Sequence, residues 1–213
     1  MRALERSFAG CPVPWVSRQS FDEVVVQGDA EGCAAFSQQV LAQILQSERL
    51  RGPAAVILSA DWQDYAAGAA LSQKFLAEGM DETLTVIGRS GARVLVIGST
   101  PHFDHSVPAC VARLGAQVCR VARARHEAQT RTAQEILVAV VSRHPHARLW
   151  DPAAHFCDAS FCVASRAGVT LFRDREHLSR AGAESASAAL APQLDWLIRR
   201  TTGTMRPVEA KMR

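Results

Sequence analysis

The stretch Arg93-Val94-Leu95-Val96-Ile97-Gly98 decides the fold class of this chain. Its consecutive apolar residues indicate a strand that is buried on both faces, and a glycine follows at the exit of the strand. A similar run, Ala54-Ala55-Val56-Ile57-Leu58, comes after the helix-breaking pair Gly52-Pro53. Continuous apolar strands of this kind are typical of parallel sheets with both faces covered.

Helical patterns alternate with these strands along the rest of the chain. Apolar residues recur at helical spacing over 33–45, and Asp81 reads as the N-cap of a helix that ends near Gly91. Ser179 reads as the cap of a final helix in which Pro192 introduces a kink. The other predicted elements are helices over 65–76, 107–114 and 128–141, and strands over 148–150 and 169–172. The alternation predicts an α/β fold, a three-layer sandwich with a central parallel sheet, similar to flavodoxin.

The composition is that of a globular protein. The chain has 213 residues, of which 48% are hydrophobic and 21% charged, and its net charge is +3. A charge this small and this scattered argues against a nucleic-acid partner. No apolar run reaches the roughly 18 residues that a membrane helix needs. We therefore expect one domain over residues 1–200 and a polar tail over 201–213.

Six cysteines fall into pairs that are close in the sequence, Cys11 with Cys33, Cys110 with Cys119, and Cys157 with Cys162. Six cysteines permit about 15 pairings, so proximity alone suggests this set. Buried reduced thiols are the alternative. Zinc is less favoured, because no paired CxxC occurs. Disulfides would indicate an oxidising compartment such as the periplasm.

Candidate chemistry should lie beyond the carboxyl ends of the strands, where open parallel sheets bind ligands. The segment Leu171-Phe-Arg-Asp174-Arg-Glu-His177-Leu-Ser179 is the most specific signal there. An aspartate and a histidine three residues apart, on a turn that enters a helix, can reach one another. The carboxylate can then fix the imidazole tautomer and leave the other ring nitrogen free to act as a base.

This segment resembles the last block of SGNH hydrolases, in the form fused to the acyltransferase-three family of envelope-polysaccharide O-acetylases. Other stretches are similar to that family in the same order along nearly the whole chain. They are Cys11-Pro-Val-Pro14, Cys33-Ala-Ala-Phe36, Val56-Ile-Leu-Ser-Ala-Asp-Trp62, Val94 to Pro101 with Val107-Pro-Ala-Cys110, and Cys157-Asp with Cys162.

The resemblance implies roles for four residues. His177 is the general base and Asp174 its orienting acid. Trp62 lines the site or packs beneath it, and core packing is its plain alternative. Asp61 stands near the oxyanion-hole position, where a charged carboxylate would repel an oxyanion. The implied scheme needs no cofactor and no metal.

The resemblance also implies partners and a location. The partners are a cell-envelope glycan, an acyl donor, and a membrane-bound acyltransferase domain that is fused or separate. The location is periplasmic, with attachment to the inner membrane through a region upstream of this chain. We therefore expect a chain that is truncated at the N-terminus.

The nucleophile that this family requires, the serine of a Gly-Asp-Ser turn, does not occur in the chain. The nearest string is Val24-Val-Val-Gln-Gly28-Asp29-Ala30. Either Ala30 replaces the serine, or the Gly-Asp-Ser strand lies upstream of Met1. The second interpretation is favoured because Cys11 and Cys33 both fit it. In either case the chain as written should be a poor catalyst.

Three alternatives remain open. The chain could be a glycan-binding or scaffolding domain that has kept the fold and lost the nucleophile. Ser59 and Ser99 follow strands and could substitute for the serine, although neither lies on a strand-to-helix elbow. A metal site could use His102-Phe-Asp-His105 and His144-Pro-His146, but no third ligand is obvious.

Overall fold

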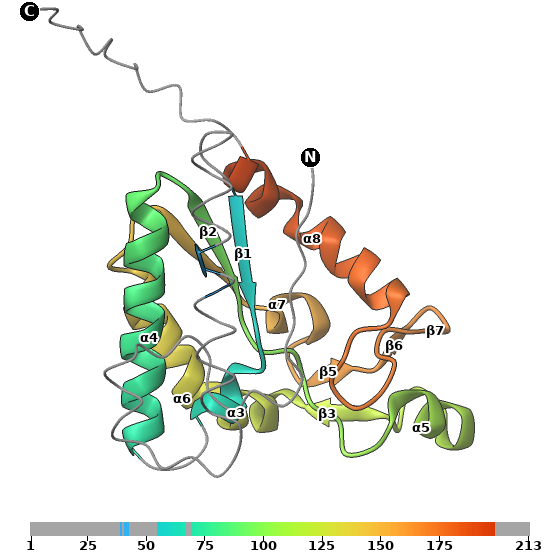
Figure 1. Cartoon of the computed structure of the whole chain (residues 1–213). Coiled ribbons are helices and arrows are strands. Elements are labelled where there is room, and N and C mark those ends of the chain that lie inside the picture. The colour runs from blue at the N-terminus through green and yellow to red at the C-terminus, as the bar shows by residue number, and fades with distance from the viewer. Residues whose placement is uncertain (1–38, 40, 43–54, 67–69, 199–213) are drawn as a thin grey trace, which may run out of the picture.

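The main sheet consists of three parallel strands (Figure 1). The computed structural model describes residues 39, 41–42, 55–66 and 70–198. The strands are β1 (Ala55–Ser59), β2 (Arg93–Ile97) and β4 (Ala147–Trp150), with β2 in the centre. Ile97 pairs with Ser59 on one side and with Trp150 on the other. The carboxyl ends of all three strands therefore lie at one edge of the sheet.

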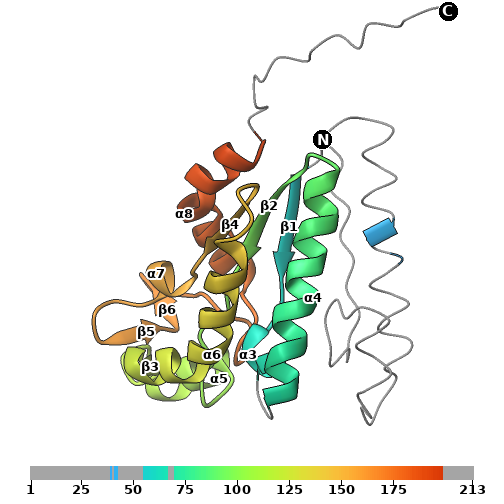
Figure 2. The ribbon, with the colours of Figure 1, turned by 90° about the vertical axis from the view of Figure 1, so that its left-hand side faces the viewer.

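Helices cover both faces of this sheet (Figure 2). On one face lie α4 (Ala70–Arg89) and α6 (Arg123–Val141), and on the other lies α8 (Arg180–Ile198). Val94 and Val96 pack in the cluster shared with α4 and α6, whereas Leu95 packs with α8. This two-sided burial is the reason that β2 is a continuous apolar run. The predicted α/β sandwich with a parallel sheet is confirmed.

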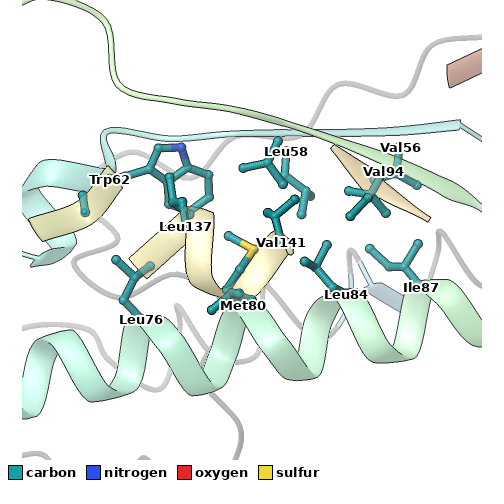
Figure 3. Packing of buried hydrophobic residues seen from close by; sticks show 14 of the residues in the cluster. Val56, Leu58, Trp62, Leu76, Met80, Leu84, Ile87, Val94, Leu137 and Val141 are labelled. Carbon is teal, nitrogen blue, oxygen red and sulfur yellow. The ribbon is translucent and has the colours of Figure 1, made fainter. Parts of the chain in front are cut away.

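The larger core lies between the sheet and helices α4 and α6 (Figure 3). One stripe of α4, spaced by three or four residues, faces the strands, so that each of its apolar side chains leaves water. Burying one such side chain contributes about 1.5–3 kcal/mol. The stripe consists of Leu76, Met80, Leu84 and Ile87.

The prediction that a helix begins at Asp81 is wrong. Helix α4 runs without interruption from Ala70 to Arg89, and a separate short helix, α3 (Trp62–Ala66), precedes it. Asp81 lies on the outer side of α4, where its carboxylate pairs with Arg143 and His144. The apolar stripe continues through this position, so packing against the sheet outweighs a local capping preference.

The strand predicted over 169–172 does not join the main sheet. Val169 and Thr170 form β7, which pairs antiparallel with β6 (Ser165–Arg166) in a small hairpin. Ala167 and Gly168 turn the chain there with positive φ angles of 50° and 79°. The rest of the predicted strand also pairs close by in the sequence, because Phe172 forms an isolated antiparallel bridge with Leu178. The turn that carries Asp174 and His177 therefore follows a hairpin rather than a strand of the parallel sheet.

A second lobe, which the sequence did not predict, supports that turn. It contains α5 (Val107–Leu114), the antiparallel pair β3 (Arg120–Ala122) and β5 (Phe161–Val163), and α7 (Ala153–Phe156). Only α5 had been foreseen, and its bounds agree with the prediction. The lobe has its own core, in which Phe172 packs edge-on or tilted against two other rings. The core includes Phe103, Val107, Val121, Phe156, Leu171 and Phe172.

Two disulfides cross-link residues within this lobe. Cys110 is bonded to Cys119, and Cys157 is bonded to Cys162. Cys11, Cys33 and Ala30 lie outside the described residues, as do most of the predicted helix over 33–45 and the tail over 201–213. The domain boundary at residue 200 therefore stays a prediction. Within the described ranges, no helix is both long and apolar enough to cross a bilayer.

Candidate active site

The turn between Arg173 and His177 brings the predicted acid–base pair together. The Nδ1 atom of His177 lies 2.8 Å from Oδ2 of Asp174. The other carboxylate oxygen, Oδ1, accepts hydrogen bonds from the backbone N–H groups of Glu176 (3.0 Å) and His177 (2.8 Å). The backbone N–H of Arg173 closes the turn by donating to the carbonyl of His177 (2.9 Å). Asp174 thus builds the turn and pairs with the imidazole at the same time.

The electrostatics of this pair favour an ionised carboxylate. Burial raises the pKa of Asp174, but the backbone N–H groups of Glu176 and His177 and the His177 side chain outweigh it and lower the pKa to about 2. The His177 side chain is 57% exposed and that of Asp174 is 43% exposed. Because Nδ1 is engaged with Asp174, Nε2 is the nitrogen left to accept a proton.

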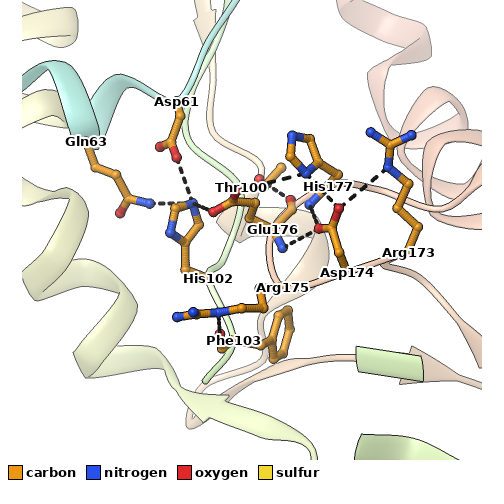
Figure 4. Close-up of polar contacts among 10 residues, drawn as sticks. All are labelled: Asp61, Gln63, Thr100, His102, Phe103, Arg173, Asp174, Arg175, Glu176 and His177. Carbon is orange, nitrogen blue, oxygen red and sulfur yellow. Dashed lines mark hydrogen bonds and ion pairs between the residues drawn. The ribbon is translucent and has the colours of Figure 1, made fainter. Parts of the chain in front are cut away.

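A second cluster of polar side chains lies at the same edge of the sheet (Figure 4). His102, on the loop after β2, places its Nε2 atom 3.0 Å from Oδ2 of Asp61 and 3.5 Å from Oε2 of Glu176. The side-chain amide of Gln63 contacts the same nitrogen (2.5 Å). Glu176 belongs to the turn just described, so this cluster adjoins His177.

The same cluster offers donors for a cation. One donor atom each from Asp61, His102 and Glu176 lies within 4.8 Å of the others, and two carboxylates with an imidazole suit a divalent metal. The metal alternative in the sequence had combined His102 with three other histidines. The structure separates His102 from His144 and His146, because His144 pairs with Asp81 and His146 contacts the Leu84 carbonyl, near the amino ends of the strands.

Backbone hydrogen bonds fasten the turn to the loop after β2. The Thr100 hydroxyl donates to the carbonyl of Glu176 (3.0 Å), and the N–H of Phe103 donates to the carbonyl of Arg175 (2.8 Å). The N–H of Val107 donates to the carbonyl of Asp174 (3.1 Å). Segments that are far apart in the sequence are therefore held in one layer at the carboxyl edge.

Trp62 occupies the core, so of the two positions expected for it, lining the site or packing beneath it, it takes the second. Its side chain is fully buried, and its indole N–H donates to the carbonyl of Ile97 (2.6 Å). Asp61, the neighbouring residue, is half-buried. Its Oδ2 pairs with His102, and its Oδ1 is buried with no hydrogen-bond partner among the described residues. An ionised carboxylate in this position does not suit an oxyanion hole.

The other polar residues at the strand ends take part in the fold rather than in either cluster. Ser99 is buried, and Ser59 is the last residue of β1. Asp151 accepts a hydrogen bond from the N–H of Ala153 at the start of α7 (2.9 Å). Sequence reasoning did not single out Glu176 or Gln63. The only signal for Glu176 was its place inside the Asp174–His177 motif.

Comparisons with known proteins agree with this architecture. A family model described as "SGNH domain (fused to AT3 domains)" matches residues 2–192. A solved structure of a lipopolysaccharide acetyltransferase periplasmic domain from Salmonella ser. Paratyphi A superposes with a TM-score of 0.59 at 11% identity. The match covers 76% of this chain and 63% of the length of that one. No curated protein matches the chain. At 11% identity, the structural likeness shows a shared fold and nothing further.

Proposed function

The chain belongs to the family of SGNH domains fused to AT3 domains, and from that premise we propose that it is the acyl-transfer domain of an enzyme that O-acylates a cell-envelope polysaccharide. The observation that carries this proposal is the 2.8 Å contact between His177 and Asp174 at the carboxyl edge of the sheet. The pair is exposed, and its turn is anchored by hydrogen bonds, which is what a general base needs.

The chemistry would be acyl transfer through a serine ester. His177 Nε2 removes the hydroxyl proton while the serine oxygen forms a bond to the acyl carbon of the donor. The protonated imidazole then gives its proton to the leaving group of the donor. In the second half, a sugar hydroxyl loses its proton to Nε2, attacks the serine ester, and the serine oxygen recovers the proton. Asp174 stabilises the imidazolium in both halves and stays ionised.

The serine itself is the part that this sequence does not provide. Two sources fit the proposal, a residue at position 30 or polypeptide outside the printed sequence. The scheme needs no cofactor. The acyl group would come from a membrane-bound acyltransferase domain of the AT3 type, and the acceptor would be a glycan on the periplasmic side of the inner membrane. The disulfides Cys110–Cys119 and Cys157–Cys162 support an oxidising compartment.

Supplying the serine tests this proposal. One version carries Ala30→Ser, and another is extended by whatever the reading frame encodes ahead of Met1. We expect one of them to hydrolyse p-nitrophenyl acetate, and His177→Ala to reduce that rate by about 10³-fold. His105→Ala is the matched control, because His105 is an exposed histidine that the scheme does not use. Equal rates with and without His177 would refute the proposal.

A binding domain of the same fold is the second candidate, and the absence of a Gly-Asp-Ser turn favours it. Calorimetry of the chain as printed with an O-acetylated and a de-acetylated envelope glycan separates the two functions. Binding of either glycan, together with no hydrolysis by any serine-supplied version, would establish the binding domain in place of the enzyme.

A further inference from the structure

The proposed acyl transfer leaves one cluster of ligating side chains without a role. Asp61, His102 and Glu176 come from three separate parts of the chain, and one donor atom of each lies within 4.8 Å of the others. Nε2 of His102 is 3.0 Å from Oδ2 of Asp61 and 3.5 Å from Oε2 of Glu176. The side-chain amide nitrogen of Gln63 lies 2.5 Å from the same atom (Figure 4). Four polar side chains therefore converge on one point.

The contacts around Nε2 of His102 conflict with one another in either protonation state. A protonated Nε2 can donate to the carboxylates, but it then faces the N–H groups of the Gln63 amide. An unprotonated Nε2 accepts from Gln63, and its lone pair then faces two negatively charged oxygens. Turning the amide brings its oxygen to the same point and leaves one proton for three acceptors. A cation removes the conflict, because it accepts electron pairs from the imidazole and from both carboxylates.

The separations of the donor atoms fit ligands around a single ion. Zinc binds imidazole nitrogen and carboxylate oxygen at about 2.0–2.2 Å, which places neighbouring ligand atoms roughly 2.9–3.6 Å apart in octahedral or tetrahedral geometry. The two distances from Nε2 to the carboxylates, 3.0 and 3.5 Å, fall in this range. An ion can therefore bind with small adjustments of the side chains.

The carboxylates of this cluster lack the compensation that carboxylates elsewhere in the molecule receive. Within the described ranges, Asp61 and Glu176 form ion pairs with histidines and with no lysine or arginine. At the other end of the sheet, Arg143 lies 2.8 Å from Asp81. Oδ1 of Asp61 is also buried, with no hydrogen-bond partner in the same part of the chain. Buried polar atoms of this kind are rare, and a bound ion or water accounts for those that occur.

The fold holds the ligands in place by contacts outside the cluster. Trp62 lies between two of them in the sequence, and its buried indole donates to the Ile97 carbonyl (2.6 Å). The Thr100 hydroxyl donates to the backbone carbonyl of Glu176 (3.0 Å). Ligands that are already positioned lose less conformational freedom when an ion binds. The three donor side chains are 22–43% exposed, so the ion can enter from solvent.

We propose that Asp61, His102 and Glu176 form a binding site for a divalent transition-metal ion, Zn²⁺ or Mn²⁺, with the amide oxygen of Gln63 available as a fourth ligand. The imidazole favours transition metals over Mg²⁺ and Ca²⁺, which prefer oxygen ligands. Water or an oxygen atom of a bound molecule completes the coordination. The site is independent of the proposed function, because none of its ligands takes part in the acyl transfer and the serine is not needed to bind the ion.

Calorimetry of the chain as printed with ZnCl₂ tests the site. We expect one saturable Zn²⁺ site per chain, and no saturable binding of Mg²⁺ at the same concentrations. Loss of an outer partner of a ligand typically weakens metal affinity by about 10–100-fold, so loss of a ligand in His102→Gln or Asp61→Asn should cost at least about 100-fold. Circular dichroism checks that each variant is folded. Asp81→Asn is the matched control, because Asp81 also pairs with a histidine, and it should bind Zn²⁺ as the parent does.

Line broadening by Mn²⁺ locates the ion without any substitution. A substoichiometric amount of MnCl₂ should broaden the NMR signals of His102 before those of His144, which lies near the amino ends of the strands. His177→Gln should leave the affinity for Zn²⁺ within about threefold of the parent, because the imidazole of His177 is not a ligand.

Four results would overturn the metal site. They are no saturable Zn²⁺ binding by the parent, unchanged binding in His102→Gln, loss of binding in His177→Gln, and binding of Mg²⁺ as tight as that of Zn²⁺. The third would place the ion on the acid–base pair instead. If Zn²⁺ binds as expected while every serine-supplied version is inactive, the proposed function fails and the metal site stands.

Discussion

Two histidine–carboxylate pairs with nearly equal separations lie towards opposite ends of the sheet. At the carboxyl end, His177 Nδ1 is 2.8 Å from Asp174, and near the amino end, His144 Nε2 is 3.0 Å from Asp81. The side chain of His177 is 57% exposed, whereas that of His144 is 11% exposed. Distance alone therefore does not distinguish an exposed pair, which a substrate could reach, from one that fastens α4 to the segment after α6.

The carboxylates of the two pairs are held in different ways. Asp174 is fixed by backbone N–H groups of its own turn, which leaves the second oxygen to orient His177. Asp81 shares one oxygen, Oδ1, between the side chains of His144 and Arg143, and no backbone donor to it is seen in the described part of the chain. A backbone-anchored carboxylate keeps its direction when its partner changes charge, which is what the proposed role of Asp174 requires. An arginine stands near each carboxylate, Arg143 at 2.8 Å from Asp81 and Arg173 at 3.7 Å from Asp174, so the backbone donors are what distinguishes the two pairs.

The largest expected effect is the difference in activity between variants of the two carboxylates, Asp174 and Asp81. In a version that supplies the serine, Asp174→Asn should lower kcat by about 10³–10⁴-fold, because the amide stabilises neither the required tautomer nor the imidazolium. Ester hydrolysis under saturating substrate measures the effect.

Asp81→Asn is the matched change near the other end. It should leave kcat within about twofold and lower the free energy of unfolding by less than about 1 kcal/mol, because the Asp81 carboxylate and its Arg143 partner are exposed. Similar losses of activity in Asp174→Asn and Asp81→Asn would contradict the distinction drawn between the two histidine–carboxylate pairs.

An intermediate effect, on the free energy of unfolding, is expected at two helical glycines. One lies near the His177 turn and the other near the amino ends of the strands. A Cβ at Gly182 in α8 would collide with the backbone carbonyl of Leu171, just before the turn, and that backbone cannot move aside. Gly182→Ala should therefore lower the free energy of unfolding by about 3 kcal/mol, measured by urea denaturation.

Gly88→Ala provides the contrast. There the added Cβ would meet the ring of His146, a side chain that can rotate away at the cost of its contact with Leu84. The expected loss is about 1 kcal/mol. If Gly88→Ala proved the more costly substitution, the turn end of the molecule would be the more adaptable one.

The smallest effect concerns the pKa values of the two carboxylates. Hydrogen bonds from His144 and Arg143 lower the pKa of Asp81, whereas Asp174, at about 2, is lowered first by its backbone donors. NMR titration should show that His144→Ala combined with Arg143→Ala returns Asp81 towards its ordinary pKa, because side chains supply the hydrogen bonds that lower it. His177→Ala should leave Asp174 clearly depressed, because both backbone donors remain.

The sign of the linked stability follows from these directions. Since the folded-state pKa of Asp174 lies below that of an unfolded aspartate, its ionisation favours the folded turn above the unfolded pKa of about 3.9. That contribution is lost as the pH falls through about 2. A pKa of Asp174 that rises fully in His177→Ala would show that the turn does not anchor the carboxylate.

Local patterns predicted the parts of the molecule that depend on neighbouring residues. The apolar runs at Val94 and Val56 identified the parallel sheet, because burial on both faces leaves no place for polar side chains. The spacing of Asp174 and His177 predicted their contact, because a turn brings such residues together without help from the rest of the chain. The prediction of a helix start at Asp81 was wrong, because packing of α4 on the sheet outweighs one capping signal.

The sequence by itself determined the sheet class, the family and the local turn with its acid and base. Only the tertiary structure decided the burial of Trp62 and the meeting of His102 with Gln63, 39 residues away, and of Thr100 with Glu176, 76 residues away. The physical reason is the range of the interactions. Periodicity and turn hydrogen bonds act between near neighbours, whereas contacts between distant loops exist only after the sheet has placed its strand ends together.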